Sequence, residues 1–100
     1  MIIEIATMKI KPGQRQAFEA AWLRAEPIIA AAKGYVAHEM RRGIEAKDKY
    51  QLLVRWQTVE AHTEGFRQSE GYQAFRALIG EFFAEPPQVE HFDAVSEYRL

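Results

Sequence analysis

Residues 50–57 show the clearest alternation of hydrophobic and polar positions and predict the central β-strand of the fold. Successive side chains of a strand point to opposite faces of the sheet. The apolar face of this segment consists of Tyr50, Leu52, Val54 and Trp56. The other face is mixed and contains Leu53 and Arg55. Because the segment holds neither glycine nor proline, we expect a strand with one dry face and one partly polar face.

Three other segments have the composition of strands. Residues 2–10 are rich in isoleucine and methionine, and Pro12 ends that run because proline cannot donate to a strand ladder. Residues 35–42 precede the central strand, and the charged connection 43–49 fits an exposed antiparallel hairpin. Residues 88–99 follow a proline pair and alternate more weakly, and we expect them to form the last strand.

A helix is predicted from about Gln14, because apolar residues recur there every three or four positions. The stripe consists of Ala17, Phe18, Ala21, Trp22, Ala25, Ile28, Ile29 and Ala32. Pro27 lies inside it, and proline removes one backbone hydrogen bond and clashes with the preceding turn. We therefore expect a kink or a break between Leu23 and Pro27. Gly34 is a suitable C-terminal cap.

A second helix is expected directly after the central strand. Thr58 is a good N-cap residue, since its hydroxyl oxygen accepts a backbone N–H. Val59, His62 and Phe66 then follow helical spacing. The strand and this helix should aim Trp56, His62 and Phe66 at a shared space, which is the candidate site.

The third helical segment is the most hydrophobic in the chain. Ser69 is expected to cap it, and the proline pair at 86–87 is expected to end it. Its apolar stripe consists of Tyr72, Phe75, Leu78, Ile79, Phe82 and Phe83.

The resulting order is β-α-β-β-α-β in one domain, residues 1–100. Right-handed crossovers place such a chain in an α+β, ferredoxin-like fold, a four-stranded antiparallel sheet with both helices on one face. The opposite face, with Leu53 and Arg55, would then be bare. We expect a second subunit to cover it in a homodimer.

Composition excludes several classes of function. A net charge of −1 gives no field that would attract nucleic acid or an acidic membrane surface. The absence of cysteine excludes thiolate metal sites and a cysteine nucleophile. The chain has no apolar run long enough to span a membrane and no leader pattern, so a soluble, cytoplasmic protein is expected. There is no glycine-rich phosphate loop for a flavin or nicotinamide cofactor.

Three motifs together resemble the antibiotic biosynthesis monooxygenase family. They are Trp56-x5-His62-x3-Phe66, Ser69-Glu70-x-Tyr72 and Val89-Glu90-His91-Phe92. The resemblance implies a dimeric α/β barrel with a cavity between sheet and helices in each protomer. Members of the family include cofactor-independent oxygenases of aromatic polyketides, quinol oxygenases and haem-degrading enzymes.

The resemblance does not extend to the haem-degrading branch. That branch relies on an asparagine, a tryptophan and a histidine, and the matching positions here hold Ala6, Phe66 and Arg76. No haem-ligand role is carried over, and no cofactor is expected.

Oxygenation without a cofactor requires a base, a dry cavity and donors that hold the developing anion. His62 is the candidate base, since imidazole accepts a proton near neutral pH. Arg55 and Arg76 are candidate anion holders. Aromatic side chains are candidate walls for a flat substrate. They are Trp56, Phe66, Tyr72, Phe75, Phe82 and Phe83.

Each of these residues also has a structural interpretation. His62 can be a hydrogen-bonded core or interface histidine, the aromatic stripe can simply be core, and Arg55 can form a salt bridge across the dimer. A metal site built from His38, His62 and His91 is disfavoured, because they lie on separate elements without close ligand spacing.

Two functions remain. The first is a cofactor-independent monooxygenase acting on a small aromatic, quinol-like or polyketide-like substrate. The alternative is a non-catalytic dimeric module that binds a small hydrophobic ligand. A cavity beside His62 large enough for an aromatic ring would favour the enzyme, whereas a space filled by aromatic side chains would favour the module.

Overall fold

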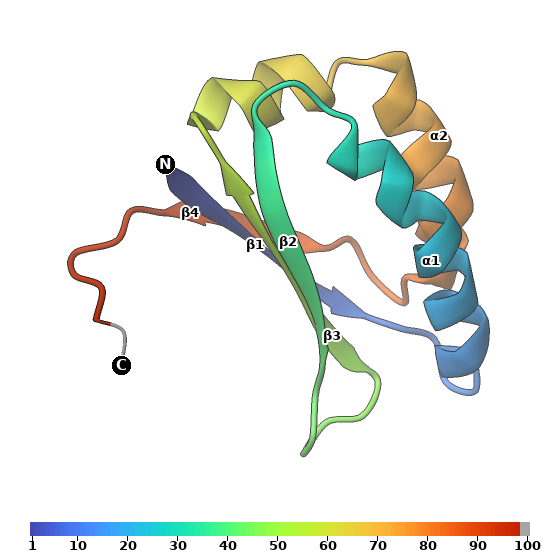
Figure 1. Ribbon diagram of the computed structural model, residues 1–100. Coiled ribbons are helices and arrows are strands. Elements are labelled where there is room, and N and C mark those ends of the chain that lie inside the picture. The colour runs from blue at the N-terminus through green and yellow to red at the C-terminus, as the bar shows by residue number, and fades with distance from the viewer. Residues whose placement is uncertain (99–100) are drawn as a thin grey trace.

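A computed structural model describes residues 1–98, which form a four-stranded sheet with two helices packed on one of its faces (Figure 1). The elements are β1 (Ile2–Lys9), α1 (Arg15–Ala30), β2 (Tyr35–Arg42), β3 (Lys49–Trp56), a π-helical segment (Ala61–Phe66), α2 (Glu70–Ile79), a 3-10 turn (Gly80–Phe82) and β4 (Gln88–Phe92). The predicted order β-α-β-β-α-β and the ferredoxin-like fold are confirmed. No helix within residues 1–98 has the length and hydrophobicity needed to cross a membrane.

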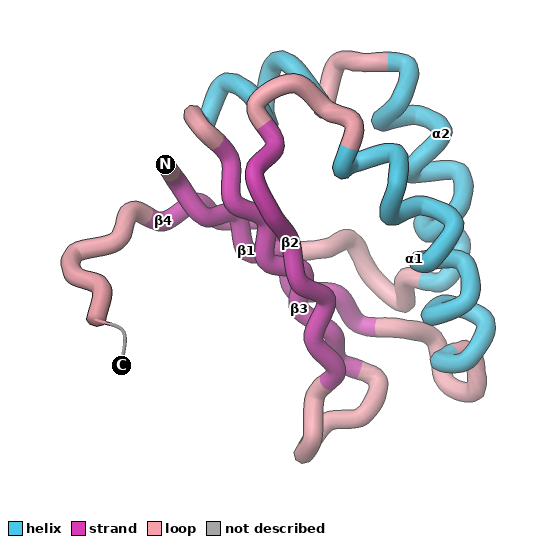
Figure 2. Tube along the Cα trace, in the orientation of Figure 1, coloured by secondary structure: helices cyan, strands magenta, loops and turns pink. Residues whose placement is uncertain are grey.

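The strands follow the order β2-β3-β1-β4, and every neighbouring pair is antiparallel. β1 therefore lies inside the sheet, between β3 and the edge strand β4. Glu4 of β1 is placed opposite Val54 on one side and opposite His91 on the other. The β2–β3 hairpin projects beyond the end of the sheet, as its charged loop predicts (Figure 2).

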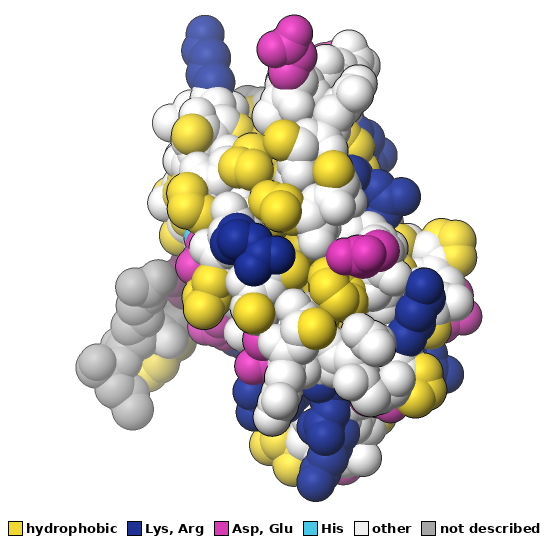
Figure 3. Space-filling model, turned by 90° about the vertical axis from the view of Figure 1, so that its right-hand side faces the viewer, with side chains coloured by type: hydrophobic (Ala, Val, Ile, Leu, Met, Phe, Trp, Pro, Cys, Tyr) yellow, Lys and Arg dark blue, Asp and Glu magenta, His cyan; other side chains and the backbone are white. Residues whose placement is uncertain are grey.

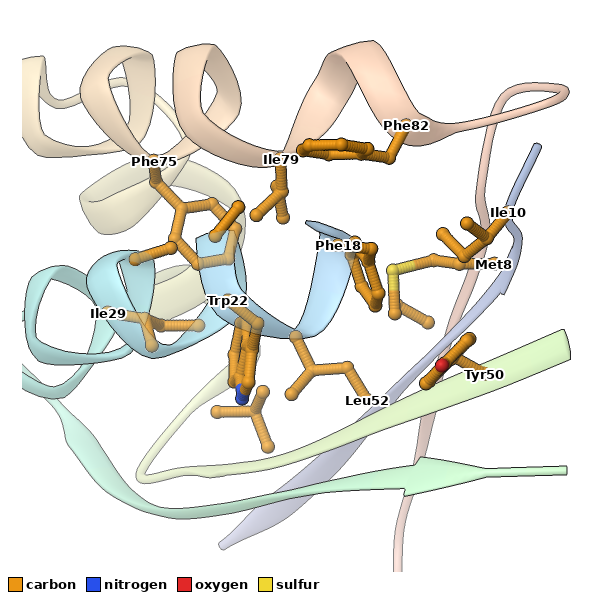
Figure 4. Close-up of a cluster of buried hydrophobic side chains, with 14 of the residues drawn as sticks. Met8, Ile10, Phe18, Trp22, Ile29, Tyr50, Leu52, Phe75, Ile79 and Phe82 are labelled. Atoms are coloured by element: carbon orange, nitrogen blue, oxygen red, sulfur yellow. The ribbon is translucent and has the colours of Figure 1, made fainter. Parts of the chain in front are cut away.

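The hydrophobic core fills the space between the sheet and the helices (Figure 4). The predicted dry face of the central strand is confirmed. Its four side chains are at most 3% exposed: Tyr50, Leu52, Val54 and Trp56. α1 contributes Phe18 and Trp22, which are also buried. Because alternate side chains of a strand lie on one side of the sheet, packing the helices on that side buries all four of them together.

The expected break in the first helix is wrong, since α1 runs from Arg15 through Pro27 to Ala30. Proline leaves the carbonyl of Leu23 without its helical donor, but both residues lie on the exposed side of α1, where water can satisfy that carbonyl. Gly34 does not cap the helix, which ends at Ala30 with Ala31 as its C-cap. It occupies the following turn with φ of 88°, and a Cβ there would lie 2.6 Å from the Cβ of Ala61.

The last helix and the last strand are both shorter than predicted. α2 ends at Ile79, well before the proline pair, because the next backbone groups bond to the end of β1. Lys11 donates to the carbonyl of Phe82 at 2.9 Å, and Ala84 donates to that of Lys9 at 2.7 Å. β4 ends at Phe92, opposite Ile3, where β1 has almost no residues left to pair. The expected strand over 88–99 is therefore wrong beyond Phe92, and Arg99 lies outside the described residues.

The sheet surface that faces away from the helices forms an open face. Its larger apolar side chains are Ile3, Ile5, Leu53 and Phe92. These residues are neighbours, since Ile5 lies opposite Leu53 and Ile3 lies opposite Phe92. No helix of the described residues covers this face (Figure 1). On the outer surface of the helices, by contrast, hydrophobic side chains are interspersed with charged ones (Figure 3).

Candidate functional site

A cavity of about 250 Å³ lies between α2 and the β1–β4 half of the sheet. Most of its wall is apolar or aromatic, as is usual for sites that bind small organic molecules. The polar and charged groups on the wall are Glu4, His62, Arg67, Tyr72 and Arg76. The cavity is therefore largely apolar, with a few polar and charged groups on its wall.

Six of the nine residues predicted for the site line this cavity. They are His62, Phe66, Tyr72, Phe75, Arg76 and Phe83. Trp56 is fully buried behind His62, and Phe82 is buried in the core against Phe18. Arg55 does not reach the cavity, because alternation along β3 places it on the open face, opposite Ile3. Arg67, which the sequence analysis did not single out, lines the cavity instead.

The π-helical segment sets the position of His62. Thr58 caps its start, as predicted, and its Oγ1 accepts the N–H of Ala61 at 3.1 Å. The segment winds wider than an α-helix, with the N–H of Arg67 donating to the carbonyl of His62 at 2.9 Å. The imidazole stacks on Trp56, with ring centres 5.3 Å apart. The candidate base is thus fixed between a rigid indole and the cavity.

Ser69 fixes the next element in the predicted way. Its Oγ accepts the N–H of Tyr72 at 3.1 Å and donates to the carbonyl of Phe66 at 2.6 Å. Both hydrogen-bonding functions of the hydroxyl are used in capping α2. The cap places Tyr72 and Phe75 on the cavity side of α2, each with its ring within 5.4 Å of the ring of Phe66.

A buried polar chain joins four elements beside the cavity. Glu4 is only 4% exposed, and its Oε1 accepts the indole N–H of Trp56 at 2.9 Å. The same oxygen lies 3.4 Å from Nε2 of His62. On its other side, Nδ1 of His62 lies 2.9 Å from Nε2 of His91. No side-chain polar atom buried within residues 1–98 lacks a hydrogen-bond partner, so this chain is a satisfied network.

Burial dominates the charge states of this chain. The pKa of Glu4 is raised because burial disfavours the carboxylate, and this outweighs the hydrogen bond from Trp56 and the charge of Arg67. The pKa of His62 is lowered to about 4 by burial first, and then by Arg67 and His91. Burial and Arg67 also lower the pKa of His91. Although Glu4 and His62 approach each other, burial outweighs their attraction because both side chains are almost inaccessible to water. His62 is therefore neutral at pH 7.

Acid should destabilise the protein through His62. Its pKa is about 4 in the folded chain and 6.5 in the reference state, so between these pH values the unfolded chain binds a proton at this histidine and the folded chain does not. The contribution of His62 to the free energy of unfolding is fully present above pH 6.5. It should be lost as the pH falls towards 4, by at most roughly 3 kcal/mol. Glu4, with a raised pKa, acts in the opposite sense. Urea unfolding of the parent and of His62→Gln at several pH values should show a shallower acid loss in the variant.

His38 belongs to a different cluster. Its Nδ1 lies 2.5 Å from the hydroxyl of Tyr35, and its Nε2 lies 2.6 Å from a carboxylate oxygen of Glu26. The structure thus brings two of the three histidines, His62 and His91, together and leaves the third between α1 and β2. Among residues 1–98, no group of three or more histidine, aspartate or glutamate side chains is arranged to hold a metal ion.

The sequence and the fold both match a known family. Residues 1–78 match the family described as antibiotic biosynthesis monooxygenase. The uncharacterized protein YczJ of Bacillus subtilis (strain 168) is 47% identical over 95 residues, which are 95% of this chain and 100% of that protein. The chain therefore belongs to the antibiotic biosynthesis monooxygenase family, and the resemblance seen in the sequence motifs is confirmed.

Solved structures agree with this assignment. A candidate antibiotic biosynthesis monooxygenase from Bordetella bronchiseptica is 44% identical, with a TM-score of 0.92 and coverage of 95% of this chain and 97% of that one. SnoaB from Streptomyces nogalater, a cofactor-independent oxygenase, is 16% identical, with a TM-score of 0.79 and coverage of 96% and 94%. The second similarity concerns the fold alone.

Proposed function

We propose that the protein is a cofactor-independent monooxygenase that oxidises a small, quinol-like aromatic molecule in the cavity beside His62. The observation that supports this most is a buried, neutral imidazole next to an aromatic-walled chamber. Family membership supports the reaction class. The absence of a phosphate-binding loop from the sequence supports independence from flavin and nicotinamide. Ala6, Phe66 and Arg76, in place of the residues of the haem-degrading branch, argue against haem.

The chemistry needs little beyond what the cavity offers. A base removes the proton of a substrate hydroxyl, and the electron-rich anion then transfers electrons to dioxygen. One oxygen atom stays on the ring, and the other leaves as water. The aromatic walls hold the ring flat and keep bulk water out. Arg67 and Arg76 supply the positive charge that stabilises the anion, which replaces the role first given to Arg55.

The size of the cavity narrows the substrate class. Its volume of about 250 Å³ lies below the roughly 300–1,000 Å³ typical of sites for drug-sized ligands. One-ring or two-ring quinols fit this space better than extended polyketides. Within the substrate classes named from the sequence, the quinol-like class is therefore favoured.

The test is oxygen uptake with a panel of quinols and anthrones, recorded without added cofactor and against protein-free autoxidation. Small quinols should be oxidised faster with the protein present, and larger polycyclic compounds should be poorer substrates. The alternative is a non-catalytic binding module. Both ring nitrogens of His62 have hydrogen-bonding partners, as expected for a histidine with a purely structural role. Ligands that quench tryptophan fluorescence but show no accelerated uptake would establish the module and refute the enzyme.

The functional unit proposed here is a homodimer whose subunits associate through the open face. Leaving Ile3, Ile5 and Leu53 in water is unfavourable for so small a chain. Sedimentation should show a dimer at micromolar concentration for the parent. Leu53→Arg on the open face should shift it towards monomer, while Leu23→Arg should not, because Leu23 is already 66% exposed on α1. A parent that sediments as a stable folded monomer would rule out this assembly.

A further inference from the structure

Glu4, His62 and His91 form a continuous line of proton-binding atoms. The line starts at the carboxylate of Glu4, reaches Nε2 of His62 over 3.4 Å, passes through the ring, and continues from Nδ1 to Nε2 of His91 over 2.9 Å. Three separate elements, β1, the π-helical segment and β4, supply one group each. A histidine with partners at both ring nitrogens can accept a proton on one side while releasing one on the other.

The two ends of this line lie in different surroundings. Glu4 and His62 are both on the wall of the cavity, and Glu4 is almost fully buried. His91 is only partly buried and sits on the edge strand β4, where it is paired with Glu4 across the sheet. The line therefore runs from the cavity to a position that solvent reaches.

The proposed reaction creates a need for such a path. A proton taken from the substrate inside the cavity must leave before dioxygen meets the anion, or it returns to the substrate. His62 holds a proton poorly at neutral pH, because its pKa is about 4. Arg67, whose charge lowers the pKa values of His62 and His91, also disfavours a resting positive charge on either ring. The proton therefore has to be passed on.

We propose that Glu4, His62 and His91 are a proton-transfer path between the cavity and the solvent, a role that rests on the proposed function. The O–H bond of the substrate breaks, its electron pair stays on the substrate oxygen, and the proton bonds to the carboxylate of Glu4, so that Glu4 accepts the proton first and His62 acts as the base towards Glu4. Glu4 passes it to Nε2 of His62 as the Nδ1 proton moves to Nε2 of His91, and His91 releases its Nδ1 proton to water. The reverse transfer restores both rings when the departing oxygen atom takes up protons to form water.

The connection itself can be tested without any substrate. In protein with isotope-labelled imidazole nitrogens, NMR should detect a coupling between Nδ1 of His62 and Nε2 of His91 across their hydrogen bond. It should also show His62 neutral with one proton at neutral pH. Absence of the coupling in the folded parent protein would overturn the path, whether or not a substrate is known.

The transfer role is tested by His91→Ala. Its kcat should fall by roughly tenfold or more, less than expected for loss of the base itself, because water can partly replace a proton carrier. Added imidazole buffer should restore kcat in His91→Ala, since the truncation opens space for a small carrier, but not in Glu4→Gln. Glu90→Gln, which changes a charge on the opposite face of β4, is the matched control and should behave as the parent.

The outcomes separate this inference from the proposed function. If His91→Ala turns over as fast as the parent in weak buffer, the path is refuted while the oxygenase activity stands. If imidazole fails to restore a slow His91→Ala, the residue acts only through structure, and the path is likewise refuted. If no compound is turned over, the proposed function fails, and the NMR coupling alone decides whether the three groups are connected.

Discussion

Replacement of His62 by glutamine should lower turnover by about 10²–10⁴-fold while leaving the protein folded. Glutamine has a similar volume and can still hydrogen-bond to Glu4 and His91, but it cannot accept a proton at neutral pH. The stacking surface on Trp56 is largely preserved. The expected loss is therefore in kcat rather than in substrate affinity. Oxygen uptake and thermal melts of the parent and of His62→Gln provide the two measurements.

The control for this experiment is His38→Gln. His38 is also a hydrogen-bonded histidine with little exposure, but it contacts Tyr35 and Glu26 far from the cavity wall. It should keep parental turnover. Parental oxygen uptake by His62→Gln on a substrate that the parent accepts would show that the imidazole does not carry the substrate proton. Equal losses in both histidine variants would point to a general structural effect instead.

Truncation of Phe82 to alanine should cost roughly 3–5 kcal/mol of folding free energy. The ring is 8% exposed and packs edge-on against Phe18, with ring centres 6.1 Å apart. Figure 4 shows it beside Ile79 and facing Phe18. The backbone around Phe82 is hydrogen-bonded to the segment that follows β1, since Lys11 donates to the carbonyl of Phe82 and Ile10 bridges to Phe83. The surrounding residues therefore cannot easily move into the space that the truncated ring leaves.

The comparison with Phe83 and Leu23 makes this prediction specific. Phe83 is only partly buried and also faces Arg76 and the cavity, so Phe83→Ala should cost less than Phe82→Ala. Leu23 is exposed on α1, and Leu23→Ala should change stability by only a few tenths of a kcal/mol. For a domain of this size each kcal/mol shifts the melting temperature by about 4–8 °C. A melt of Phe82→Ala within a degree of the parent would disprove the assignment of Phe82 to the core.

Local patterns were sufficient to predict the fold. The alternation in residues 50–57 identified the buried face of β3, and the capping residues Thr58 and Ser69 located the starts of two helical segments. These signals are local, because each depends on residues that are close together in the sequence: a single capping hydroxyl, or the alternating positions of one strand. The element ends were predicted less well. The early end of α2 depends on backbone bonds to β1, which are distant in sequence.

The candidate site was predicted only in part for the same reason. His62 and Phe66 share a helical segment with each other, so their spacing carried the prediction. Glu4 and His91 enter the site only because β1 pairs with β4, and the register of that pair cannot be read from either strand alone. The pattern of β1 was also misleading, since Glu4 lies between isoleucines and resembles a solvent-facing position.

The burial of Glu4 bears on how securely the sheet keeps its alignment. β1 turns Ile3 and Ile5 outward, whereas Glu4 points inward on the same side as the buried Ala6 and Met8. A slip of one residue would exchange the two sides, so Ala6 and Met8 would leave the core and Glu4 would lose the hydrogen bond from Trp56. The burial of Ala6 and Met8 and the hydrogen bond to Glu4 therefore both favour the observed register.

In the proposed homodimer a second subunit buries Ile3 and Ile5 while Glu4 keeps its partners. Subunit dissociation would expose these isoleucines next to the edge strand β4, and exposed apolar strands at a sheet edge are prone to aggregation. For this chain, assembly and resistance to aggregation are therefore coupled through the outward side of β1.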